Sequence, residues 1–248
     1  YKRQALKAQA ITSRSFALYQ LRKNANDPYD VESTVMSQVF KSGFKNNPIL
    51  SSALNSTFGL ILTSDGAPFS AYFHSSCGDH TDPSSVVFPD RPSARPLTPV
   101  GCGFCSISPA HRWKFTMEKR VIQDKLSSQF SGRQTLTGVT LLDISGAAIG
   151  PGAGPMRRVS TVFLRRSDGS TAPLSANQFR LAVGARDLKS MQFEQVVDTG
   201  SAIEFTGGGF GHGVGLCQWG SQGMALGGYN HLQILGKYYT GAALSKIY

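Results

Sequence analysis

No stretch of this sequence is long and apolar enough to cross a membrane, since none approaches the ~20 residues that a spanning helix needs. A secretory signal pattern is missing, and so is any internal repeat or low-complexity tract. With 248 residues, 40% of them hydrophobic, the chain can bury a substantial core. We therefore expect a globular protein, with any membrane anchor in a segment outside this chain.

Several motifs that would assign a chemistry are missing as well. The sequence contains no P-loop, G-x-G-x-x-G, H-E-x-x-H or G-x-S-x-G pattern. Interpretations as a nucleotide-binding protein, a zinc metalloprotease or an α/β-hydrolase therefore have no support.

Acidic residues are scarce. The chain has 15 of them against 25 Lys and Arg, which gives a net charge of +10. Such an excess favours a polyanionic partner, which could be nucleic acid, an anionic membrane surface or the acidic polymers of a bacterial wall. The basic residues are scattered and no nucleic-acid-binding motif accompanies them, so we do not expect nucleic acid. A solvated basic surface without a specific partner is the alternative.

Cysteine is also sparse, but three of the four residues are close together in sequence. Cys77-x-x-His80 and Cys102-x-x-Cys105 form two pairs with the spacing of a closed tetrahedral zinc site. We expect a structural zinc ion on these four residues, with His74 as a possible replacement for His80. A disulfide from Cys77 to Cys102 or Cys105 is the alternative.

Glycine, by contrast, is concentrated in one run. Residues 206–220 read Thr-Gly-Gly-Gly-Phe-Gly-His-Gly-Val-Gly-Leu-Cys-Gln-Trp-Gly. Because glycine permits positive φ and has no Cβ, such a run brings backbone close to a ligand. We expect an ordered loop that forms the wall of a site, with His212 on it and Gln218 and Trp219 below, suited to contact sugars. The alternatives are a flexible linker, or a core Trp219 with a hydrogen-bonded His212.

Residues 4–21 predict a helix, because strong helix formers fill this segment without Gly or Pro. The helix is apolar on several sides, so we expect it to be buried in the centre of a domain. One stripe of mostly small residues predicts close packing: Leu6, Ala10, Ser13, Ala17 and Leu21.

The rest of the chain mixes the two kinds of element. Residues 49–62 predict a helix or helical turn that leads into a strand around 60–63, and a turn at 64–68 before a strand-like segment at 69–74 predicts a hairpin. Further strand-like segments begin near residues 113, 136, 158, 171 and 193, and helices are expected near 121–130, 218–225 and 231–239. We predict an α+β fold with a discontinuous core domain, residues 1–110 with 200–248, that contains the buried first helix and the Gly-rich cleft loop. Residues 111–199 form a smaller inserted α+β domain.

Three segments together resemble the SpoIID family (stage II sporulation protein D), which includes the amidase-enhancer (LytB) proteins. They are Ala5-Leu-Lys-Ala-Gln-Ala-Ile11 with Arg14, Ala71-Tyr-Phe-His-Ser-Ser76 with Thr81, and Gly209-Phe-Gly-His-Gly-Val-Gly-Leu-Cys-Gln-Trp-Gly220. The resemblance implies an extracytoplasmic cell-envelope protein, secreted or membrane-anchored, of cell division or sporulation. It would cleave peptidoglycan glycan strands as a lytic transglycosylase or muramidase, preferring strands without stem peptides, with an amidase as a possible partner. Some members of the family carry zinc near Cys77.

One position departs from the family's pattern. The resemblance places a catalytic glutamate directly before Ala5, where this sequence has Gln4. Glycosidic cleavage needs a proton on the leaving oxygen, which a carboxylic acid supplies and a carboxamide does not. We therefore expect an inactive chain. Either Gln4 was introduced to trap a ligand, which the intact neighbouring motif favours, or it is natural in a protein that binds without cutting.

The remaining candidate residues flank this position. Gln9 and Arg14 on the first helix would contact substrate or brace the Gly-rich loop through its carbonyls, and bracing is the favoured role for Arg14. The family pattern places His74 and Ser75 in the cleft. No compact pair of carboxylates is present. This fits a lytic transglycosylase, whose nucleophile is the sugar's own 6-hydroxyl, better than a hydrolase with two acids.

Overall fold

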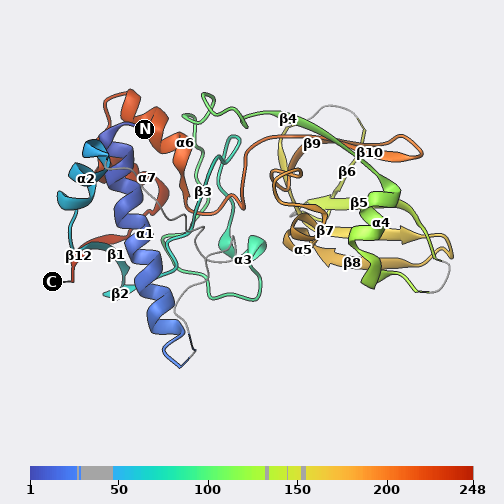
Figure 1. Cartoon of the computed structure of the whole chain (residues 1–248), viewed down its shortest axis with the longest axis horizontal. Coiled ribbons are helices and arrows are strands. Elements are labelled where there is room, and N and C mark those ends of the chain that lie inside the picture. Colours follow the sequence, from blue (N-terminus) through green and yellow to red (C-terminus); the bar gives the residue numbers. More distant parts are fainter. Residues whose placement is uncertain (27, 29–46, 132–133, 144, 152–154, 248) are drawn as a thin grey trace.

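The computed structural model describes residues 1–26, 28, 47–131, 134–143, 145–151 and 155–247. Helices and strands are both abundant, so the predicted α+β class is confirmed. The described residues form two hydrophobic cores. One contains residues from 8–105 and 214–239, and the other residues from 113–205. Figure 1 shows the corresponding halves of the molecule, helices dominating one and a sheet the other.

The first core is arranged around α1 (Arg3–Lys23), which packs against α2 (Pro48–Asn55), β1 (Leu60–Ser64), α6 (Gln218–Leu226) and α7 (His231–Tyr238) (Figure 1). Its buried apolar residues are Ala5, Ala8, Ile11 and Phe16. The stripe predicted to pack closely lies beside this face: none of its five residues is buried, and Leu21 is 48% exposed. The most deeply buried face of α1 is therefore the one with Ala5 and Ala8, and the predicted stripe is half-buried except at Leu21.

Two short sheets complete this half of the molecule. The predicted hairpin after residue 60 forms only in part: β1 pairs with β2 (Ala67–Pro68), not with residues 69–74, and β12 (Ala243–Lys246) pairs with the other edge of β1. Asp65 and Gly66 form the turn with positive φ angles of 51° and 79°. β3 (Phe73–His74), expected in that hairpin, instead pairs in parallel with β11 (Leu216–Cys217). This pairing joins the Gly-rich segment to the chain around residue 73.

The second core underlies a seven-stranded sheet. Its strands are β4 (Trp113–Glu118), β5 (Leu136–Asp143), β6 (Ala148–Ile149), β7 (Arg157–Arg166), β8 (Thr171–Ser175), β9 (Gln192–Asp198) and β10 (Ala202–Gly207). Because β10 pairs with both β4 and β9, it belongs to this sheet. The domain boundary predicted at residue 200 would instead place β10 in a different domain from β4 and β9.

Short helices cover the sheet and the junction between the halves: α3 (Ser84–Val87), α4 (Lys119–Lys125), a 3₁₀ turn (Ser127–Gln129) and α5 (Ala176–Val183). The helix α5 was not predicted from the sequence. A capping box explains where it starts, since Ser175 accepts from the backbone N–H of Gln178 while the Gln178 side chain accepts from that of Ser175. In Figure 1, α3 and α5 lie where the two halves face each other.

Candidate functional site

The Gly-rich loop packs against the chain around β3. The backbone N–H of Ser76 donates to Phe210 O at 3.0 Å and that of Phe210 to Ser76 O at 2.6 Å. A Cβ on Gly209 would lie 2.7 Å from Ser76 O, and one on Gly211 at 2.7 Å from the Cβ of His74. The loop is ordered as expected, but at these two positions its glycines permit contact with protein backbone and side chain rather than with a ligand.

His74 of β3 and His212 of the Gly-rich loop form a pair of neutral imidazoles, with ring centroids 5.3 Å apart. The N–H of Val214 donates to His212 Nδ1 at 3.1 Å, so the ring proton of His212 is on Nε2, 2.9 Å from Phe73 O. Burial lowers the pKa of His74 to about 4 and holds that of His212 well below its usual value. Nε2 of His74 is buried without a hydrogen-bond partner in the described structure.

His212 is therefore a hydrogen-bonded loop residue, one of the two roles that the sequence left open. It borders a small cavity between the halves of the molecule, whose lining contains neither Gln218 nor Trp219. The expected stack of His212 above these two side chains is thus not formed.

His212→Ala is expected to lower the free energy of unfolding by about 2 kcal/mol, because it removes two hydrogen bonds and opens a gap against Phe88 and His74. Urea unfolding followed by circular dichroism measures this loss. An unchanged unfolding curve would show that these two hydrogen bonds contribute nothing to stability.

Gln4 lies in the first turn of α1 and contacts the start of α7. Its Oε1 accepts from the backbone N–H of His231 at 3.1 Å and lies 3.0 Å from His231 Nδ1. The Gly-rich loop takes no part in these bonds. His231 was not predicted from the sequence as a site residue. The only sequence signal beside it is Asn230, which starts the last helix.

A second cavity, of about 190 Å³, lies between α1 and α6. Gln218 Nε2 donates to Gln9 Oε1 at 3.2 Å across it, and the Tyr1 ring lies 5.6 Å from that of the half-buried Trp219, tilted by 48°. No charged side chain lines this cavity; the lining residues are Tyr1, Ala5, Leu6, Gln9, Leu216, Gln218 and Ser221. Gln9 and Gln218, both predicted from the sequence, are thus brought together.

Arg14 and Ser75 have supporting positions. Nη1 of Arg14 donates to Thr57 O at 2.8 Å and Leu60 O at 2.6 Å. Arg14 therefore braces the turn between α2 and β1, not the Gly-rich loop as predicted. Ser75 contributes its carbonyl, which accepts from the N–H of Trp219 at 3.0 Å and fixes the start of α6.

The four cysteines form one buried cluster. The Sγ atoms of Cys77, Cys102, Cys105 and Cys217 all lie within 4.8 Å of one another, and all four are free. The Cys77–Cys105 separation is 3.5 Å. Four thiolates bound tetrahedrally at ~2.3 Å from a zinc ion would have sulfurs ~3.8 Å apart. The cluster therefore has the dimensions and the donor atoms of a closed Cys₄ zinc site.

His80 lies outside this cluster, contrary to the ligand set that spacing suggested. Its ring contacts Gln192 Nε2 at 3.2 Å and Asp82 at 3.6 Å. Cys217 takes the fourth place because the parallel pairing of β11 with β3 brings it beside Cys77, whose N–H donates to Cys217 Sγ at 3.3 Å. Cys77 and Cys217 are 140 residues apart in the sequence, so the short spacings between the other ligands do not reveal their contact.

Burial, which is the largest cause for Cys217, and hydrogen bonding within the cluster give the four thiols two kinds of pKa. Bonds from neighbouring thiols lower the pKa of Cys102, and Cys105 is lowered too, whereas the pKa values of Cys77 and Cys217 are raised. Cys217 is also the N-cap of α6, since its Sγ accepts from Gly220 N at 3.2 Å. The cluster and the helix that carries Gln218 and Trp219 are therefore one structural unit.

Comparison with known proteins gives consistent matches. The family profile described as "SpoIID: Stage II sporulation protein" matches residues 1–64. A stage II sporulation protein D of Bacillus amyloliquefaciens is 30% identical over 99% of this chain and 70% of its own length. An uncharacterised Brachyspira hyodysenteriae protein is 31% identical over 96% of the chain. The amidase enhancer of Bacillus subtilis is 25% identical over 98%.

These relatives are longer than the chain. It covers 60% of the Brachyspira protein and 38% of the amidase enhancer. Among the described residues, no helix combines the length and the apolar character that crossing a membrane requires.

Proposed function

Because this chain belongs to the SpoIID family, we propose that it binds peptidoglycan glycan strands between α1 and α6. The observation that carries this proposal is the uncharged cavity beside Trp219, lined by Gln9 and Gln218. Carboxamides match the paired donors and acceptors of sugar hydroxyls and N-acetyl groups, and an aromatic ring stacks on the apolar face of a sugar. A volume of about 190 Å³ suits part of a sugar rather than an extended polymer.

The proposed reaction of the fold is lytic transglycosylation in cell-envelope remodelling, outside the cytoplasm. An acid at position 4 would protonate the leaving glycosidic oxygen while the sugar's 6-hydroxyl attacks the anomeric carbon, which closes a 1,6-anhydro ring. Gln4 has no proton to transfer in this way, and its Oε1 is bonded to His231. We therefore infer a chain that binds strands and leaves them intact.

A second candidate is a glycan-binding module that activates an amidase. Gln4 itself favours it, because a carboxamide, which supplies no acidic proton, is held at this position by two contacts with His231. Similarity to a protein named amidase enhancer agrees with a partner of this kind. The net charge of +10 would assist either function by attracting the chain to acidic wall polymers.

We further infer that the cysteine cluster holds one structural zinc ion. A site closed by four thiolates leaves no position for water or substrate, so the metal would stabilise the fold and take no part in bond cleavage. Cys217 would transmit this support to α6, directly before Gln218 and Trp219.

Trp219→Ala is expected to weaken binding to purified glycan strands by about two- to tenfold, because stacking on an aromatic ring contributes about 0.5–1.5 kcal/mol. Cosedimentation or calorimetry measures the affinity. Tyr229→Ala, which removes another partly exposed aromatic ring, is the matched control and should bind normally. Equal affinity of wild type and both variants would refute glycan binding at this cavity.

A further inference from the structure

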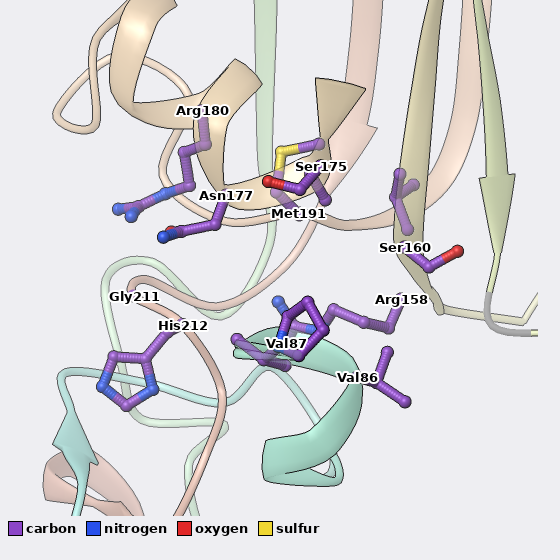
Figure 2. Close-up of a pocket in the computed structure, with 13 residues that line it drawn as sticks. Val86, Val87, Arg158, Ser160, Ser175, Asn177, Arg180, Met191, Gly211 and His212 are labelled. Carbon is purple, nitrogen blue, oxygen red and sulfur yellow. The ribbon is translucent and has the colours of Figure 1, made fainter. Parts of the chain in front are cut away.

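A cavity of about 40 Å³ lies at the junction of the two halves of the molecule, apart from the α1–α6 cavity. Figure 2 shows Arg180 and Asn177 extending from α5 on one side, Val86 and Val87 of α3 on the other, and Gly211 and His212 of the Gly-rich loop below. A water-sized group needs ~10–15 Å³ by this measure, so the cavity accepts about three such groups.

Two guanidinium groups line this cavity, and they differ in their partners. Nε of Arg158 donates to Asp82 Oδ2 at 2.7 Å, and both side chains are almost fully buried. Nε and Nη2 of Arg180 donate to three backbone carbonyls, those of Ala185, Leu188 and Lys189. Among the described residues, no carboxylate forms an ion pair with Arg180, although it is only 8% exposed.

A buried charge without a counter-charge is costly, because carbonyl dipoles replace only part of its hydration. Burial first, and then the neighbouring Arg158, lower the pKa of Arg180 to about 10. Since the guanidinium still carries its proton at neutral pH, the cavity has an uncompensated positive charge. Its chemistry therefore favours a small anion.

The cavity opens into a wider groove of about 420 Å³, with which it shares Val86, Pro89, Ser160 and Ser175. Valine and proline on the shared wall suit an apolar group beside the anion. A ligand that fits both would have a small anionic branch in the cavity and a larger neutral body in the groove.

We propose that this cavity binds a carboxylate, and that its source is the free lactyl group of muramic acid in strands without stem peptides. This rests on the proposed function. The lactyl ether places a carboxylate and a methyl group on one short branch of a sugar ring, as the cavity and groove require. A stem peptide converts this carboxylate into an amide, which removes the charge that Arg180 would bind.

The test uses calorimetric titration of the full chain with four probes: N-acetylmuramic acid, its carboxamide, N-acetylglucosamine, and D-alanyl-D-alanine as the other source of a wall carboxylate. Asn177→Asp is the informative variant. It places a negative charge beside Arg180, and an acidic residue in the first turn of α5 is compatible with folding. Gln178→Glu is the matched control, because it adds the same charge on the next residue, whose exposed side chain bonds to Ser175 N and is not part of the cavity lining.

We expect wild type and Gln178→Glu to bind N-acetylmuramic acid at least tenfold more tightly than its carboxamide or N-acetylglucosamine, and Asn177→Asp to lose this preference. Tighter binding of D-alanyl-D-alanine would keep the carboxylate site but overturn the lactyl source. Equal binding of the acid and its carboxamide by wild type would overturn the site.

These outcomes are separable from the proposed function. If glycan strands bind wild type and Asn177→Asp equally, this inference fails while glycan binding at the α1–α6 cavity stands. If no strand binds but Asn177→Asp still abolishes carboxylate binding, the carboxylate site stands and the proposed function fails.

Discussion

Protein purified without chelator is expected to contain about one zinc ion per chain, and removal of this ion should destabilise the α1-containing half of the molecule strongly. At free zinc a thousandfold above its Kd, a metal that binds only the folded state contributes about 4 kcal/mol. The four buried thiols connect the loop around Cys102 and Cys105 to β3 and α6. Loss of the metal would therefore affect the packing of all these segments. Elemental analysis and thermal unfolding with and without chelator measure the two quantities.

The ligand set has a matched pair of variants. Cys217→Ser should lower both zinc content and thermal stability, whereas His80→Ala should leave the zinc content unchanged, since its ring lies outside the cluster. The reverse result would restore the ligand set that spacing suggested. Absence of metal together with a mass lower by the two hydrogens lost in each disulfide would show that the cluster is oxidised instead.

The fold class and most elements could be predicted because they depend on local patterns. The helix around Ala5–Ile11 follows from helix propensity, and the hairpin at Asp65–Gly66 from turn residues. Failures occurred where packing decides. A half-buried side of α1 contains small residues that look like a packing stripe, and β10 belongs to its sheet through pairing with β4 and β9, which no local pattern records.

The candidate site shows the same division. Gln9 and Gln218 were predicted individually, and the structure joins them through a hydrogen bond across 209 residues. Cys217, His231 and Arg180 were missed as site residues, because each acquires its role from a contact with a distant segment or from the absence of a partner. Side-chain chemistry could be predicted from the sequence, but the sets of residues that act together could not.

Position 4 has a defined environment for a glutamate. In a Gln4→Glu variant the carboxylate would occupy the same space and accept from the backbone N–H and Nδ1 of His231 at the N-terminus of α7. Both hydrogen bonds favour the charged carboxylate and so hold its pKa low. An acid catalyst in this position is therefore expected to work best at acidic pH, where more of it is protonated.

Gln4→Glu is expected to produce cleavage of strands without stem peptides, faster than any residual activity of the present chain by a factor of ~10²–10⁴, the usual contribution of general acid catalysis. Mass spectrometry of the released fragments measures it, and a 1,6-anhydro end shows that the 6-hydroxyl attacked. Affinity should change little, because Gln and Glu have almost the same volume. Gln9→Glu is the control: it introduces the same carboxylate on α1 but away from His231, and should remain inactive.

The pH dependence gives this prediction a second measurement. Adding His231→Ala to Gln4→Glu removes the ring donor while the backbone N–H remains, which should raise the pKa of the glutamate and move the fastest cleavage toward neutral pH. A rate maximum that stays at the same pH would show that His231 does not set the protonation of residue 4. If Gln4→Glu binds strands at every pH but releases no fragment, the missing carboxylate is not what silences the chain, and the amidase-activating module is the function that remains.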